Sequence, residues 1–228
     1  MGDRIRSVAV RPIRLTPTEA ELAVKVEVNA PAADAEVHGR LMGPTCKYSS
    51  TIEVAYPIRR VPEASGPTSR IGRVIIPEPA WWDLQSPFLY HGPVDLWEGG
   101  QAVAKTQVRC GLHHATAVGG RLMWNGRPLE LRVASKPVAT IGDLAALREV
   151  GWNLVLVDAD VLPGLLDTAD EIGILLAGYA ADAAARASPE SPLHHPSLLG
   201  FIGSTESGGP LYLTGGRGLL ELVPETDA

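Results

Sequence analysis

Trp81-Trp82-Asp83-Leu84-Gln85-Ser86-Pro87-Phe88-Leu89-Tyr90 opens the segment that decides the fold of this chain, and Gly119-Gly120-Arg121-Leu122-Met123-Trp124-Asn125-Gly126-Arg127-Pro128-Leu129-Glu130-Leu131-Arg132 closes it. In the second stretch, two short apolar runs flank Asn125-Gly126. Asn-Gly between apolar runs is the strongest short signal for a hairpin, because both residues tolerate the positive φ angles of a two-residue turn. The sequence therefore predicts a tight β-hairpin in this stretch.

The residues before the hairpin, from Ile5 to about His114, carry only β signals. Apolar residues occupy every second position of residues 22–28, and residues 103–110 alternate in the same way, as in strands with one buried face. Further strands are predicted at residues 5–10, 35–41, 50–56, 71–76 and 89–97. Seven short strands separated by turn residues are typical of an immunoglobulin-like sandwich.

Two interpretations fit the aromatic pair Trp81-Trp82. The first is packing at the end of the β domain, against the domain that follows. The second is a platform on which a sugar ring stacks, since aromatic side chains are enriched at ligand-binding sites. We therefore treat both residues as candidate substrate-binding groups beside the packing alternative.

The apolar period becomes helical after the hairpin. Thr140 is placed to cap a helix with Ile141, Leu144, Leu147 and Val150 on one face, and a second apolar stripe runs over residues 162–172. Gly151 and Gly173 stand where helices end. Buried strands are predicted at residues 129–133, 153–157, 174–177 and 198–203, with a short helix at residues 182–187. This βαβαβαβ order predicts parallel strands.

The segment from residue 84 to residue 132 resembles glycoside hydrolase family 2, the group of β-galactosidases, β-glucuronidases and β-mannosidases. The matching residues are Leu84, Ser86-Pro87, Leu89-Tyr90, Arg109, Gly111-Leu112, Gly120, Asn125-Gly126, Pro128 and Leu131-Arg132, while Gln85 and His113 replace the usual Trp and Arg. The similarity continues through residues 144–153, 166–175 and 195–199. The resemblance implies a mixed fold, with an immunoglobulin-like sandwich at residues 1–117 and an α/β partial (half) TIM barrel at residues 118–228.

The resemblance also implies a catalytic position. Aligned from His195-Pro196-Ser197, Glu206 stands where the family carries its general acid/base, at the carboxyl end of a barrel strand. Thr205 replaces the family's Asn, which binds the sugar 2-hydroxyl, so Thr205 is a candidate substrate-binding residue. Glu206 also has a plainer interpretation as an exposed carboxylate beside the glycine-rich turn at residues 208–210.

Retaining glycosidases need two carboxyls about 5–5.5 Å apart. The family's nucleophile comes from a late barrel strand, and 22 residues follow Glu206 in this sequence, whereas a complete barrel takes about 250 residues. We therefore expect a degenerate, non-catalytic binding or structural module. The alternative is an active β-glycosidase in which Glu206 is the acid/base and a partner chain supplies the second carboxylate. The enzyme assignment stays open, with the non-catalytic reading favoured.

Composition limits the partners. A net charge of −6 gives no electrostatic case for nucleic acid or an anionic membrane. The sequence shows neither a signal peptide nor an apolar run long enough to span a bilayer, so we expect a cytoplasmic protein. An open parallel sheet would expose apolar edges, which predicts a homodimer or another partner that covers them. A carbohydrate is the expected ligand, and no cofactor is implied.

Several polar clusters received two interpretations. Cys46 and Cys110 form a disulfide or, as we favour, are separate buried thiols. Adjacent histidines on a strand point to opposite faces, so His194-His195 does not chelate a metal by itself, and no metal site is predicted. Asp158 and Asp160 bind a cation or, more simply, cap the next helix. The glycines at residues 215–218 form a hairpin turn rather than a phosphate loop.

Overall fold

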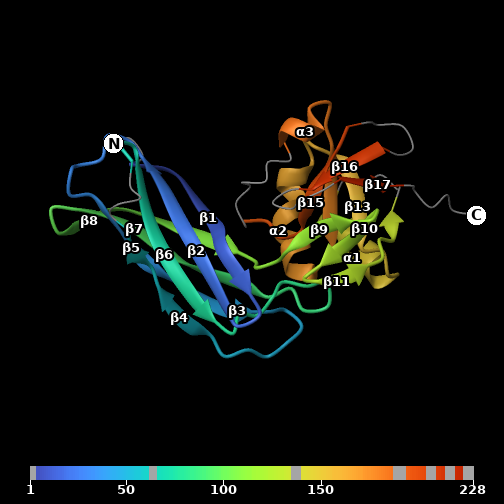
Figure 1. Cartoon of the computed structure of the whole chain (residues 1–228), viewed down its shortest axis with the longest axis horizontal. Helices are drawn as coiled ribbons and strands as arrows, with labels where there is room; N and C mark the ends of the chain where they lie inside the picture. Colours follow the sequence, from blue (N-terminus) through green and yellow to red (C-terminus); the bar gives the residue numbers. More distant parts are fainter. Residues whose placement is uncertain are drawn as a thin grey trace, which may run out of the picture.

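The computed structural model describes residues 4–61, 66–134, 140–186, 194–203, 209–213 and 219–222. Strands dominate these residues, and three helices accompany them. Figure 1 shows strands β1 to β8 together in one half of the molecule, while the helices and the strands from β9 onward occupy the other half. None of the described helices is both long enough and apolar enough to cross a membrane.

The first half consists of two four-stranded antiparallel sheets. One sheet has the order β1 (Ile5–Thr16), β2 (Glu19–Val28), β6 (Ser69–Pro77) and β5 (Arg59–Arg60). The other has the order β4 (Val54–Pro57), β3 (Glu36–Thr45), β7 (Leu89–Glu98) and β8 (Gln101–Cys110). The strands expected from the period-two pattern are confirmed, and β5 is an additional short strand.

One apolar core joins these two sheets. Every second residue of β2 is fully buried, namely Ala20, Leu22, Val24, Val26 and Val28. They share a cluster with residues of the neighbouring strand β6 and with residues of β3 and β7 in the other sheet. Alternation along a strand places these side chains on one face and the polar side chains on the other, so burial of this face stabilises both sheets together.

The hairpin is confirmed. Strands β10 (Arg121–Trp124) and β11 (Arg127–Leu129) pair across Asn125 and Gly126, whose φ angles are 50° and 78°. Positive φ at both central residues is the geometry that Asn-Gly favours. Strand β9 (Ala115–Val118) pairs with the other side of β10, so the hairpin belongs to a three-stranded sheet.

The second half is built on four parallel strands, in the order β12 (Val133–Ala134), β13 (Leu154–Asp158), β14 (Leu175–Tyr179) and β15 (Leu198–Ile202). Helices α1 (Ile141–Glu149), α2 (Leu162–Ile172) and α3 (Ala183–Arg186) connect them. The predicted βαβαβαβ order is confirmed. The first strand was placed wrongly at residues 129–133, because Leu129 pairs within the hairpin and the parallel strand is Val133–Ala134.

Both faces of the parallel sheet are covered, as its continuous apolar strands require. Leu154, Leu156 and Leu175 pack toward the hairpin sheet in a cluster with Trp82 and Trp124. Val155 and Leu176 point to the opposite face and pack against the helices. The hairpin sheet therefore closes one side of the parallel sheet while the helices close the other.

The helix ends follow the expected chemistry in part. Thr140 and Asp143 form a capping box at α1, and Gly173 ends α2 with a left-handed φ of 71°. The apolar stripe of α1 was overestimated, because Ile141 and Val150 are exposed and Leu144 is the buried residue of this helix. The capping role expected for Asp158 or Asp160 is wrong, since Val161 occupies the N-cap of α2 without a side-chain hydrogen bond.

An antiparallel pair of strands extends the parallel sheet. Strand β16 (Gly209–Leu213) runs antiparallel to β15, and β17 (Leu219–Leu222) runs antiparallel to β16. The expected hairpin over residues 211–222 is confirmed, while its turn at residues 214–218 lies outside the described residues. The unpaired edge of β15 is thereby covered within the chain.

The two cysteines are separate thiols, so the disulfide alternative is wrong. Cys110 is fully buried in the sandwich core, and this burial raises the pKa of its thiol to about 12. Cys46 is half-buried.

Gly173 gives a test of how tightly the two halves meet. A Cβ atom there would lie 2.4 Å from the backbone oxygen of Leu84, and the residue also has positive φ. We expect Gly173→Ala to lower the free energy of unfolding by about 1–3 kcal/mol, measured by urea denaturation.

Gly164→Ala is the matched control in the same helix. A Cβ atom at Gly164 meets nothing within 4 Å. Alanine has the better helix propensity by about 1 kcal/mol, so this variant should be unchanged or more stable. Equal destabilisation by both variants would contradict the close contact at Gly173.

Candidate functional site

The position expected to carry catalysis lies at the carboxyl end of β15. This strand ends at Ile202, and the described chain continues to Gly203. Thr205 and Glu206 lie outside the described residues. Their roles as sugar-binding residue and acid/base therefore stay predictions from the sequence.

The same edge of the sheet carries two described polar residues. Asp158 ends β13 and is exposed, and it stands in register with Tyr179, which ends β14. Burial of the phenol raises the pKa of Tyr179, and the nearby Asp158 charge raises it further. This edge thus presents one carboxylate and one neutral phenol from the described strands.

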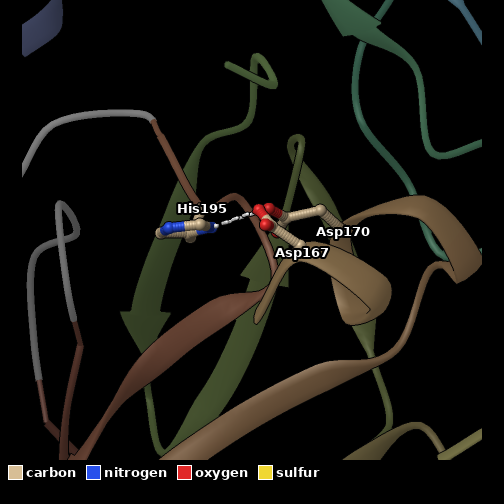
Figure 2. Close-up of side chains that lie close together, drawn as sticks. All are labelled: Asp167, Asp170 and His195. Carbon is tan, nitrogen blue, oxygen red and sulfur yellow. Dashed lines mark hydrogen bonds and ion pairs between the residues drawn. The ribbon is translucent and has the colours of Figure 1, made fainter. Parts of the chain in front are cut away.

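A second polar cluster lies where α2 meets β8 and the segment before β15. Figure 2 shows the ring of His195 pointing at the carboxylates of Asp167 and Asp170. Asp170 has no exposed surface. Its Oδ2 lies 2.8 Å from Nδ1 of His195, and its Oδ1 accepts hydrogen bonds from the backbone N and the Oγ of Ser197, at 3.0 Å and 2.6 Å. Four donors in all surround this buried carboxylate.

The fourth donor is Arg109, which lies near the end of strand β8 in the sandwich. Its Nη2 lies 3.3 Å from Oδ2 of Asp170 and also contacts Asp167, and its Nη1 lies 3.1 Å from Glu171. A buried carboxylate needs an opposite charge and full hydrogen bonding, because desolvation of an unpaired charge is costly. The cluster therefore joins the two halves of the molecule electrostatically.

The cluster also meets a geometric criterion for a cation site, since one ligand atom each of Asp167, Asp170 and His195 lies within 4.8 Å of the others. The chemistry argues otherwise. The guanidinium of Arg109 already neutralises Asp170 at 3.3 Å, and a cation there would face a positive charge at close range. We therefore assign this cluster to the junction between the two halves and propose no metal site on it.

His194 points the other way from His195. Its Nε2 lies 2.8 Å from the carbonyl oxygen of Val8, and its Nδ1 lies 3.3 Å from that of Arg109. Burial of the ring lowers the pKa of His194, so the imidazole is neutral at pH 7 and donates to one of the two carbonyls. The adjacent histidines therefore tether the start of β15 to both halves.

The two tryptophans of the opening stretch have different surroundings. Trp82 has no exposed surface, its Nε1 donates to the carbonyl oxygen of Asp170 at 2.8 Å, and its ring meets that of Trp124 edge-on. A ring covered on every side offers no face to a sugar, so Trp82 packs between the halves and is not a substrate platform. Trp81 is half-buried and borders a cavity.

No protein-family model matches this sequence, and neither does any curated protein. Solved structures do match. A glycosyl hydrolase family 2 member from Bacteroides cellulosilyticus aligns with a TM-score of 0.59 at 14% identity, over 86% of this chain and 29% of that one. The β-glucuronidase of Parabacteroides merdae aligns with a TM-score of 0.58 at 16% identity, over 87% and 28%. The β-glucuronidase of Bifidobacterium dentium aligns with a TM-score of 0.57 at 16% identity, over 76% and 30%.

This chain has the fold of the corresponding part of glycoside hydrolase family 2 proteins. The resemblance drawn from the motifs is thereby confirmed at the level of the fold. The chain spans about three tenths of the length of these structures. At identities of 14–16%, the likeness carries the fold and not the activity.

The meeting of Arg109, Asp170 and His195 went unpredicted, although each residue belongs to a motif recognised in the sequence. Asp170 is separated from Arg109 by 61 residues and from His195 by 25. A signal was present in the charges themselves, since one motif contributes the basic Arg109 and another contributes the acidic Asp167, Asp170 and Glu171.

Asp170 provides a test of the junction. We expect Asp170→Asn to lower the free energy of unfolding by about 2–4 kcal/mol, because Arg109 and His195 then face a neutral amide in a buried site. Asp167→Asn is the control, since Asp167 is 77% exposed and its pairing with Arg109 should contribute about 1 kcal/mol or less. Urea denaturation measures both, and equal losses would contradict the role of burial.

His113 gives the molecule a pH dependence. Its ring stacks on Trp124 with centroids 4.9 Å apart, and its Nδ1 is buried without a partner among the described residues. Burial lowers the pKa of His113 from 6.5 to about 4. Above pH 6.5 the ring is neutral in both folded and unfolded chains. As the pH falls toward about 4, the unfolded chain alone takes up the proton, so stability decreases.

We therefore expect His113→Phe to unfold with a shallower loss of stability between pH 6.5 and about 4 than the unchanged chain. His194 contributes a loss of the same sign in both proteins, because its pKa is also lowered. Urea midpoints measured across this range make the comparison. Parallel curves for the two proteins would show that His113 is not the group responsible.

Proposed function

We propose that these 228 residues form a glycosidase-like scaffold that does not cleave glycosides by itself and acts as a binding or structural module. The scaffold consists of an immunoglobulin-like sandwich at residues 1–117 and part of a TIM barrel at residues 118–228. Two facing antiparallel sheets support the first assignment. Four parallel strands alternating with helices support the second.

One observation carries the non-catalytic part of the proposal: β16 pairs antiparallel with β15 through residues 211–213. A TIM barrel consists of eight parallel strands, so the next parallel strand would have to pair with this same edge of β15. The backbone groups along that edge are already bonded to β16. Closure of a barrel beside β15 in the usual order is therefore opposed by the pairing itself.

The chemistry points in the same direction. A retaining glycosidase places its nucleophile opposite the acid/base, about 5–5.5 Å away, and a late barrel strand carries that nucleophile in the family that the sequence resembles. Asp158 is the carboxylate that the described parallel strands present at their carboxyl edge, and it comes from an early strand. An early strand does not provide the position opposite Glu206 that the reaction needs.

We expect the purified chain to release no nitrophenol from nitrophenyl β-galactoside, β-glucuronide or β-mannoside above the rate of a Glu206→Gln variant. The same samples should be sized by light scattering, because the predicted homodimer is also the arrangement in which a second chain would supply a carboxylate. The absorbance of nitrophenolate gives the rate.

Turnover that disappears in Glu206→Gln would overturn the proposal in favour of the active glycosidase. A dimer without turnover would support an assembly that covers an edge of the six-stranded sheet, at β12 or at β17. A monomer without turnover would leave the scaffold role intact and remove the dimer from it.

A further inference from the structure

A cavity of about 490 Å³ lies between the sandwich and the hairpin, away from the parallel strands. Its walls come from the end of β1 with the turn after it, the segment before β7, the link from β8 to β9, and the hairpin turn. Leu15, Thr16, Trp81, Asp83, His114 and Arg127 are the lining residues used below. The volume is within the range of about 300–1,000 Å³ that small-molecule sites occupy.

The walls of this cavity are held in place by hydrogen bonds. Nδ2 of Asn125 donates to the carbonyl oxygen of Trp82 at 2.9 Å, and Oδ1 of Asn125 accepts from the backbone N of His114 at 2.9 Å. The backbone N of Asn125 donates to the carbonyl oxygen of His114 at 2.8 Å. Asn125 thus joins three of the four walls, so the cavity exists before a ligand enters.

The floor is apolar. Leu15 and Trp81 are half-buried and pack against the sandwich core, which fixes their orientation. Both side chains also border the cavity. An indole held by a core on one side presents a flat, apolar surface on its remaining side, at little cost in conformational entropy.

Polar groups stand around this floor. The carboxylate of Asp83 accepts one hydrogen bond, from the backbone N of Gln85 to Oδ1 at 3.3 Å, and a carboxylate has about four acceptor positions. The side chains of His114 and Arg127 are exposed and form no side-chain hydrogen bond or ion pair with the described residues. One acceptor group and two donor groups therefore border the same cavity, and each can form further hydrogen bonds.

We propose that this cavity binds one pyranose unit of a carbohydrate. A pyranose has two apolar C–H faces and a rim of hydroxyls, which matches an aromatic floor with donors and acceptors at its edge. Trp81 stacks on one face of the ring, Asp83 accepts from adjacent hydroxyls, and Arg127 and His114 donate to the opposite rim. This inference rests on the proposed function as a binding module and names its class of ligand.

The experiment is a titration followed by the indole signal of Trp81 in ¹H–¹⁵N spectra, with methyl β-D-glucopyranoside and methyl β-D-glucuronide as probes. We expect saturable shifts at concentrations on the order of 10 mM. We expect binding to weaken by about tenfold or more in each of three variants, Trp81→Ala, Asp83→Asn and Arg127→Ala. Binding by the variants is measured from the shifts of the backbone signals of residues 83–127. We expect the glucuronide to bind more tightly than the glucoside, because Arg127 can form an ion pair with the glucuronide carboxylate.

Trp152→Ala is the matched control, because Trp152 is also half-buried but packs on the helix side of the parallel sheet. Its titration should equal that of the unchanged chain. Arg127→Ala keeps the test decisive if Trp81→Ala fails to fold, since Arg127 is exposed. Absence of shifts for both probes would overturn the site, and so would binding by Arg127→Ala and Asp83→Asn that is as tight as binding by the unchanged chain. Nitrophenyl glycoside turnover is measured separately, so failure of this site is distinct from failure of the non-catalytic proposal.

Discussion

The buried carboxylate of Asp170 sets the relation between the two halves of this molecule. A charge without exposed surface is tolerated only where an opposite charge and enough donors replace water. Asp170 belongs to α2. Its donors are Arg109, at the end of β8, and His195 and Ser197, which precede β15. Displacement of any one of these segments would leave the charge partly unpaired. The constraint therefore fixes three segments at one point.

Neighbouring contacts depend on that arrangement. The carbonyl oxygen of Asp170 accepts from Trp82, which brings the segment before β7 onto α2. Leu84 then lies against Gly173, where the space holds no Cβ atom, and its carbonyl oxygen accepts from Arg148 at 3.2 Å. The carbonyl oxygen of Trp82 also accepts a hydrogen bond from the side-chain amide of Asn125, so the hairpin turn is bound to the same segment. The positions of the cavity walls beside Trp81 therefore depend on the contacts around Asp170.

The sequence was most informative where burial imposes a period. The alternation in β2 and the continuous apolar runs of β13 and β14 determine which faces are covered, and both were predicted. The hairpin was predicted because Asn125-Gly126 has one favoured geometry. Helix α1 was overestimated, since a helical spacing of apolar residues does not tell whether a neighbour covers them, and Ile141 and Val150 face solvent. The Asp170 network and the cavity join residues far apart in the chain, which no local pattern encodes.

The strand that follows β15 has two structural tasks in this fold, and both concern packing. Leu211 of β16 is fully buried in the cluster that Leu156 and Leu175 form beneath the hairpin sheet. It covers apolar side chains of the parallel sheet and at the same time β16 bonds the edge of β15. Both needs would otherwise fall to a further parallel strand. Because β16 meets both needs, the packing of the described parallel strands does not depend on a further parallel strand beside β15.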